Sequence, residues 1–174
     1  MELFTTDRFL VRQWRDDPAD VEACFEIYRD EDVSRWLERP PFREHSEARE
    51  ANLRQLDRYA RYDGLGWWPV LSRADGEVVG QVALMPIPDA PHELELGYHV
   101  ARPWWGRGVA TEVARGIIDY ATQRFPEQQV IAVTRPHNAA SRRVMVKLGL
   151  RYVGETVFKG LHSVKYVNDP SPTE

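Results

Sequence analysis

Two hydrophobic patterns alternate along the chain, one with the period of a strand and one with the period of a helix. In residues 93–101 apolar side chains occupy every second position, so Glu95 and His99 share a polar face. In residues 107–124 apolar side chains recur every three or four positions from Val109 onward. The first pattern predicts a half-buried strand, and the second predicts an amphipathic helix packed against a sheet.

The same criteria, with turn and capping residues, predict an order of elements for the whole chain. The order is strand 3–13, helices 17–28, 32–37 and 46–59, strands 66–72, 78–85 and 93–101, helix 107–124, strand 129–135, helix 138–148, and strands 150–158 and 162–168. Hairpins dominate, with one β–α–β crossover through helix 107–124. We therefore expect an α/β domain of the α+β type over residues 1–168, followed by a flexible tail over residues 169–174. Its mixed, mostly antiparallel sheet has six or seven strands, one parallel pair and about four flanking helices.

Composition narrows the class of protein. The 174 residues include 43% hydrophobic and 29% charged ones, which is ordinary for a globular domain. The net charge of −4 argues against a nucleic-acid partner. A single cysteine, Cys24, excludes an internal disulfide and a cysteine-based zinc site, and we expect no metal. No apolar run is long enough to span a membrane, and the N-terminal residues lack a signal-peptide pattern, so we expect a cytoplasmic protein without a membrane partner.

The segment most informative about function is glycine-rich and lies between a predicted strand and a predicted helix. It reads Arg102-Pro103-Trp104-Trp105-Gly106-Arg107-Gly108. Free N–H groups in the first helical turn would suit a pyrophosphate, although an ordinary glycine turn explains the pattern as well. A P-loop is excluded, because no Lys-Ser/Thr follows Gly108, and the repeated βαβ units of a dinucleotide-binding fold are missing.

Four short sequence motifs follow one another along the second half of the chain. They are Glu95-Leu96-Gly97-Tyr98, Trp105-Gly106-Arg107-Gly108-Val109-Ala110-Thr111-Glu112, Asn138-Ala139-Ala140-Ser141 and Lys147-Leu148-Gly149-Leu150. In this order they resemble the signatures of the GNAT acyltransferase superfamily. The opening Thr5-Thr6-Asp7-Arg8-Phe9-Leu10-Val11-Arg12, Asp30-Glu31-Asp32-Val33 and the Trp at position 105 resemble its RimJ/RimL-type branch more narrowly.

The resemblance implies the GNAT fold, with acetyl-CoA as the donor and direct transfer of the acetyl group to an amine. Its pantetheine arm would lie between two splayed strands, and its pyrophosphate would rest on the glycine-rich turn. The residues implied in donor binding are Leu96, Tyr98, Val100, Arg102, Trp105, Gly106, Arg107, Gly108, Val109, Ala110, Asn138 and Ser141. Asn138 is equally explained as a helix cap. Gly97 is expected to allow a β-bulge that frees a backbone N–H for the thioester carbonyl.

Two residues are implied in catalysis. Glu95 is the candidate base, although its position also fits a solvated strand face. Ser141 is the candidate acid for the leaving thiolate, because Met145 stands where many relatives carry a tyrosine. A CoA thiolate could also leave without a dedicated acid.

The acceptor is the open question at this stage. Trp36, Trp67 and Trp68 are candidate acceptor contacts, although tryptophans at such positions more often belong to the core. Branch resemblance implies the α-amine of a protein N-terminus. A small amine such as an antibiotic or a polyamine, a non-catalytic acyl-CoA-binding module and a phosphate-binding scaffold are the alternatives. A homodimer is a further expectation.

Overall fold

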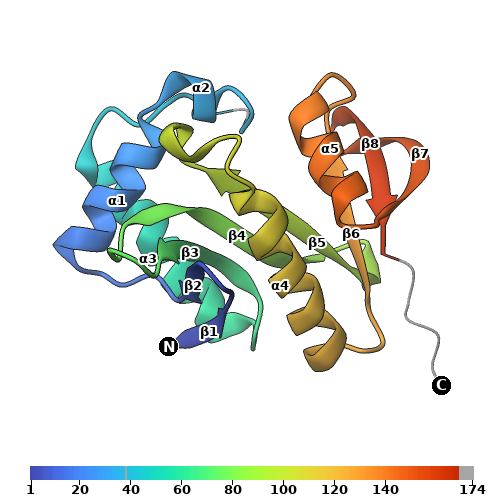
Figure 1. Cartoon of the computed structure of the whole chain (residues 1–174), viewed down its shortest axis with the longest axis horizontal. Helices are drawn as coiled ribbons and strands as arrows, with labels where there is room; N and C mark the ends of the chain where they lie inside the picture. Colours follow the sequence, from blue (N-terminus) through green and yellow to red (C-terminus); the bar gives the residue numbers. More distant parts are fainter. Residues whose placement is uncertain (38, 169–174) are drawn as a thin grey trace.

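The computed structural model describes residues 1–37 and 39–168, so the predicted tail at residues 169–174 lies outside the described residues. One eight-stranded sheet contains every strand, in the order β1-β2-β3-β4-β5-β6-β8-β7 (Figure 1). The elements along the chain are β1 (Glu2–Thr5), β2 (Phe9–Arg12), α1 (Pro18–Tyr28), α2 (Glu31–Ser34), α3 (His45–Arg61), β3 (Gly66–Ser72), β4 (Val78–Ile87), β5 (Ala90–Val100), η1 (Arg102–Trp104), α4 (Val109–Arg124), β6 (Gln129–Thr134), α5 (Ala139–Lys147), β7 (Arg151–Phe158) and β8 (Leu161–Val167).

The mixed, mostly antiparallel sheet and its single parallel pair are confirmed, and the count of strands is one higher than expected. The segment 3–13 is not one strand, because a turn closed by the hydrogen bond from Thr6 N to Phe9 O folds it into the β1–β2 hairpin. The third helix, α3, begins earlier than the sequence predicts. Glu47 accepts hydrogen bonds from the backbone of Arg43 and Glu44, so α3 starts at His45 rather than at a Ser46 cap.

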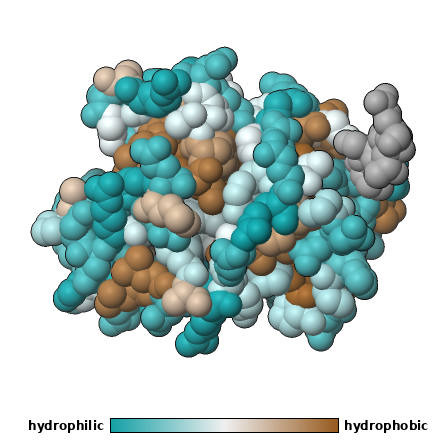
Figure 2. Space-filling model, turned by 90° about the horizontal axis from the view of Figure 1, so that it is seen from below, coloured by the Kyte–Doolittle hydropathy of each residue, from teal (hydrophilic) through white to brown (hydrophobic). Residues whose placement is uncertain are grey.

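Helices cover both faces of the central strands (Figure 1). Leu94 and Leu96 pack into the main core with Val113 and Ile117 of α4. The opposite face of β5 meets α1, where Tyr28 lies 3.0 Å from Nδ1 of His99. On the face of the molecule shown in Figure 2, hydrophilic residues separate the hydrophobic ones into small groups. No helix within the described ranges is long and apolar enough to cross a membrane.

β5 and β6 form the parallel pair, and they stay paired over only three residues. The register runs from Glu93 opposite Gln129 to Glu95 opposite Ile131. Both strands continue beyond these residues without pairing to each other, since β5 ends at Val100 and β6 at Thr134. The expected splay of the two strands is therefore present, and it opens the edge of β5.

The prediction of a β-bulge at Gly97 is wrong. β5 pairs with β4 in unbroken register from Gly80 opposite Val100 to Pro86 opposite Leu94. The need for glycine at position 97 has another structural cause, because a Cβ atom built on Gly97 would lie 2.7 Å from the Trp67 ring. The glycine makes room for that indole, and the N–H groups on the open edge of β5 are left free by the splay.

A buried ion pair joins β2 to α1 and predicts a large effect on stability. The Arg12 guanidinium donates to both carboxylate oxygens of Asp20 at 2.6 and 2.7 Å, and this hydrogen bonding raises the pKa of Arg12. The two side chains are only 8% and 4% exposed. Asp20→Ala leaves a buried unpaired cation, so we expect a loss of about 3–5 kcal/mol in the free energy of unfolding. Urea denaturation measures it.

The matched control is Asp16→Ala, which removes an exposed ion pair with Arg49. We expect its urea midpoint to stay close to that of the parent, because exposed pairs contribute little. An Asp20→Ala midpoint as close to the parent as that of the control would contradict the assigned importance of the pair.

Candidate active site

A cleft of about 760 Å³ opens at the splay. Its walls come from β5, the turn before α4, the end of β6, the start of α5, the β7–β8 turn and the α1–α3 region. Residues from both faces of β5 line it, including Glu95, Leu96, Tyr98 and Val100, because the open edge of this strand is itself a wall. Figure 1 shows α2 and α5 on the two sides of this region. The splay thus opens the sheet into a cleft.

The glycine-rich turn forms one end of the cleft. Gly106 and Gly108 have φ of 73° and 78°, a left-handed conformation that favours glycine. Gly108 is the N-cap of α4, and no side chain of the described residues caps this helix. Val109 and Ala110 line the cleft at the start of the helix. The free N–H groups and the positive end of the helix dipole make this turn suitable for a phosphate.

The turn is anchored from behind by the β1–β2 hairpin. Glu112 accepts hydrogen bonds from Thr6 Oγ1 and from the backbone and side chain of Arg8. Burial alone would raise the pKa of Glu112, but these bonds outweigh it and the pKa is lowered. Arg8 also donates to the carbonyl of Arg107 at 3.0 Å. These contacts hold the turn in place independently of any ligand.

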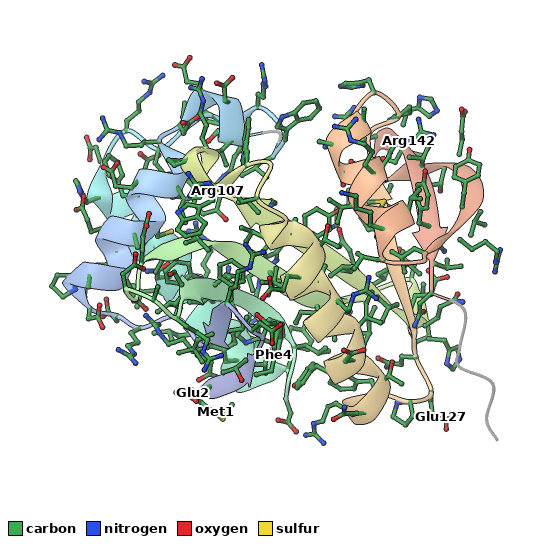
Figure 3. All side chains as sticks on the ribbon, viewed as in Figure 1. Met1, Glu2, Phe4, Arg107, Glu127 and Arg142 are labelled. Carbon is green, nitrogen blue, oxygen red and sulfur yellow. The ribbon has the colours of Figure 1, made fainter. Side chains whose placement is uncertain are left out.

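Two expected phosphate ligands do not line the cleft through their side chains. Arg102 donates to Asp32 at 2.9 Å, and the Arg107 guanidinium lies over the Trp104 ring. Trp105 does line the cleft, and its indole N–H donates to the carbonyl of Val100 at 2.7 Å. Figure 3 shows Arg107 at the loop that leads into α4 and Arg142 beside α5.

Unlike Arg102 and Arg107, two cationic side chains of α5 line the cleft. Arg143 and Lys147 on α5 lie along its wall. Arg142 does not, because it donates to the Tyr166 hydroxyl and to the carbonyl of Pro136. The α5 wall is therefore positively charged, as a wall near phosphate groups would need to be.

Glu95 lies in the cleft and has a partner that the sequence reasoning missed. Lys159 donates to Glu95 Oε2 at 2.7 Å, and the Glu95 side chain is 17% exposed. Lys159 and Gly160 form a two-residue turn in which both have positive φ, 50° and 80°. The Lys-Gly pair between two predicted strands indicates this tight turn in the sequence. What the sequence does not reveal is that this turn reaches β5.

Ser141 is joined to β5 across the splay. The Tyr98 hydroxyl lies 2.9 Å from Ser141 Oγ and 3.2 Å from its carbonyl oxygen. Burial raises the pKa of Tyr98 to about 12, so its phenol is protonated at neutral pH. Asn138 accepts from the N–H of Ser141 at 3.1 Å, which confirms the predicted helix cap, and Asn138 also lines the cleft. A hydroxyl pair, Tyr98 and Ser141, therefore faces the cleft.

The three candidate tryptophans have different positions. Trp36 lines the cleft, and its ring lies 5.6 Å from that of His137, which connects the two walls. Trp67 lines the cleft and stacks on His99 at 4.6 Å. Trp68 is 1% exposed within the main core and is absent from the described lining, because it faces the opposite side of β3. The expected acceptor contact of Trp68 is therefore not supported by its position.

Known proteins resemble the chain over nearly all of its length. The family model described as an acetyltransferase (GNAT) domain matches residues 8–151. An uncharacterized N-acetyltransferase, p20, from Bacillus licheniformis is 25% identical over 154 residues, which is 88% of this chain and 85% of p20.

Solved structures share the fold. A GNAT-family acetyltransferase from Bacillus anthracis superimposes with a TM-score of 0.82 at 22% identity, covering 97% of this chain and 98% of that one. A ribosomal-protein-S5-alanine acetyltransferase from Vibrio fischeri gives 0.76 at 19% identity, covering 99% and 98%. With the family model matched over most of the described strands and helices, the chain belongs to the GNAT family of N-acetyltransferases.

Proposed function

We propose that the protein transfers an acetyl group from acetyl-CoA directly to the α-amine at the N-terminus of a polypeptide. The observation that carries this proposal is the meeting of three features at one cleft. These are the open edge of β5, the uncapped N-terminus of α4 and the Tyr98–Ser141 hydroxyl pair. A free strand edge, an anion site and a proton donor are the groups that a CoA thioester and its leaving thiolate require.

In the proposed complex the backbone holds most of the donor. The pyrophosphate rests on the N–H groups that follow Gly106 and Gly108, and the pantetheine arm lies along β5 beyond Glu95. Arg143 and Lys147 line the cleft and supply positive charge for the phosphates. An N–H on the free edge near Leu96 or Gly97 polarises the thioester carbonyl.

In the proposed reaction the amine nitrogen attacks the carbonyl carbon, a C–N bond forms and the C–S bond breaks. Glu95 accepts the proton that the amine loses, directly or through water, at the oxygen that Lys159 does not occupy. The leaving thiolate takes a proton from Ser141, and Ser141 takes the phenolic proton of Tyr98. Tyr98 regains a proton from solvent, and Glu95 releases its proton to solvent. Lys159 holds the Glu95 carboxylate at the cleft and donates no proton in this scheme.

Two arguments support an α-amine as the acceptor. At pH 7 an α-amine is about a tenth to a sixth neutral, whereas a lysine amine is neutral about once in 2500 molecules. A site with one paired carboxylate is better suited to the amine that needs less help with deprotonation. The Vibrio fischeri structure, which is named for acetylation of a ribosomal-protein alanine, shows that the fold carries such a reaction elsewhere.

Donor binding should depend on the turn before α4. Gly108→Asp places a side chain at φ 78° and a negative charge beside the phosphate site. We expect calorimetry to show acetyl-CoA binding weakened by about 100-fold or more. The matched control is Gly76→Asp, which has the same φ of 78° in the β3–β4 turn outside the cleft. Unchanged affinity in a folded Gly108→Asp variant would contradict the assigned phosphate site.

Glu95 should matter for chemistry more than for donor binding. Glu95→Gln keeps the shape of the side chain but cannot accept the proton, so we expect kcat to fall by about 100-fold with acetyl-CoA affinity within a few-fold of the parent. Glu93→Gln is the control, because Glu93 shares the strand face, pairs with Lys165 and lies outside the cleft lining. If KM rises while kcat is preserved, Glu95 only orients the amine. Steady-state kinetics with both constants unaltered would remove Glu95 from the site.

Transfer should not pass through the cysteine. Burial raises the pKa of the Cys24 thiol to about 12, so almost none of it is the nucleophilic thiolate at neutral pH. We expect Cys24→Ala to keep most of the acetyltransferase activity, measured as release of free CoA thiol. An acetyl group found on Cys24 by mass spectrometry of a quenched reaction would show an acyl-enzyme and overturn direct transfer.

A further inference from the structure

The end of the cleft away from the glycine-rich turn is bounded by α1, α3 and β3. Tyr28, Arg39, Asn52, Trp67 and His99 line it, and we call these five residues the acceptor end. The proposed donor does not use them, since its phosphates and pantetheine arm occupy the other end. Their chemistry therefore bears on the second substrate.

Arg39 provides a cation with unused hydrogen-bonding capacity. Its guanidinium lies over the Tyr28 ring at 4.1 Å and over the Phe42 ring at 4.3 Å. Its Nη2 atom is buried and has no hydrogen-bond partner among the residues that the structure describes. Two aromatic faces stabilise the charge and fix the plane of the group, but they do not satisfy its N–H donors. A buried donor of a charged group without a partner is costly, so an anion in the cleft would be strongly favoured.

Asn52 repeats this pattern on α3. Its side chain is 1% exposed, and Nδ2 has no hydrogen-bond partner within the described ranges. The unpaired atom is again a donor. Arg39 and Asn52 come from different segments, and both line the cleft and carry a buried donor without a hydrogen-bond partner among the described residues.

His99 contributes no charge to this end at physiological pH. The Tyr28 hydroxyl lies 3.0 Å from His99 Nδ1, and either group can be the donor of this hydrogen bond. Burial, assisted by the charge of Arg39, lowers the pKa of His99 to about 3. The imidazole is therefore neutral at physiological pH and adds no positive charge to that of Arg39.

The charge of the whole cleft agrees with these donors. Among the described residues that line it, Glu95 is the one carboxylate, and Lys159 already pairs with it. Arg39 is the cation of the acceptor end, and its charge acts on both Tyr28 and His99. A polycationic amine would meet the positive charge of Arg39 there, and none of the described residues at this end is acidic.

From this arrangement we infer that the acceptor carries a carboxylate as well as its amine, and that Arg39 and Asn52 bind this carboxylate. The inference rests on the proposed function and specifies its substrate class. For a polypeptide acceptor, the carboxylate is an acidic side chain close to the N-terminus. A free amino acid or short peptide could offer its own C-terminal carboxylate to the same donors. The inference disfavours polyamines and polycationic antibiotics as acceptors.

A matched acceptor series tests the inference. The series consists of short peptides with Asp, Asn or Lys at the second position, each as a C-terminal amide and as a free acid, together with spermidine. We expect kcat/KM for the Asp peptide amide to exceed that for the Asn peptide amide by about tenfold or more, because one charged hydrogen bond is lost. The Lys peptide and spermidine should be the poorest acceptors. Preference for any free acid over its amide would identify the C-terminal carboxylate as the recognised group.

Variants then locate the preference. Arg39→Gln should remove the Asp-over-Asn preference while acetyl-CoA affinity stays within about threefold, which also shows that the variant is folded. Asn52→Asp, a change that preserves side-chain shape, should lower kcat/KM for the Asp peptide by charge repulsion. Arg54→Gln is the control, because Arg54 lies on α3 outside the cleft lining and pairs with Glu50 at 3.7 Å. It should keep the full preference.

The outcomes separate this inference from the proposed function. Equal kcat/KM for Asp and Asn peptides, or a preference that survives Arg39→Gln, would overturn the carboxylate site and leave the N-terminal acetyltransferase intact. If the parent acetylates no peptide, binding of the N-acetylated Asp peptide in the presence of CoA is measured by calorimetry instead. Binding that weakens about tenfold in Arg39→Gln supports the carboxylate site while the proposed reaction fails, and binding that is absent or insensitive to Arg39 overturns both.

Discussion

β5 and β6 are hydrogen-bonded over three residues and then separate, and the position of the site depends on this short pairing. A strand inside a sheet normally has both rows of backbone groups paired with neighbouring strands, whereas β5 beyond Glu95 has no neighbouring strand on its β6 side. Two parallel strands that begin in register can part in this way only if other contacts hold their far ends. Here α4 packs beneath β4 and β5, and the Tyr98 hydroxyl bridges β5 to α5 at Ser141.

The C-terminal hairpin fixes the paired end of these strands. Lys165 of β8 donates to both oxygens of Glu93, and Lys159 of the β7–β8 turn donates to Glu95. The two carboxylates on the polar face of β5 are therefore tied to the hairpin that lies across β6. This arrangement gives one side chain, Glu95, both a structural contact and a place in the proposed chemistry. The hairpin consequently belongs to the site, although it lies at the edge of the sheet.

Local pattern was enough to predict the order of elements apart from the β1–β2 hairpin, the parallel pair and the cap at Asn138, and the open strand edge was implied by the family resemblance. Local pattern failed to predict the role of a side chain where a residue distant in the sequence determines that role. The role of Gly97 depends on the Trp67 ring across β4 and β5, and alternation along β3 cannot say which of Trp67 and Trp68 faces the core. Lys159 and Arg39 are ordinary charged residues in sequence, and only tertiary contacts bring one to Glu95 and the other to a pair of aromatic rings.

The central claim is that one ligand, acetyl-CoA, occupies both the open edge of β5 and the turn before α4. Amide hydrogen exchange with and without acetyl-CoA tests it most directly, because bound backbone N–H groups exchange slowly. The account predicts that residues 96–100 and 107–111 become protected together at saturating acetyl-CoA, while the β1–β2 hairpin changes little. Saturated binding that leaves the exchange of both segments unchanged, or that protects the glycine-rich turn alone, would contradict it.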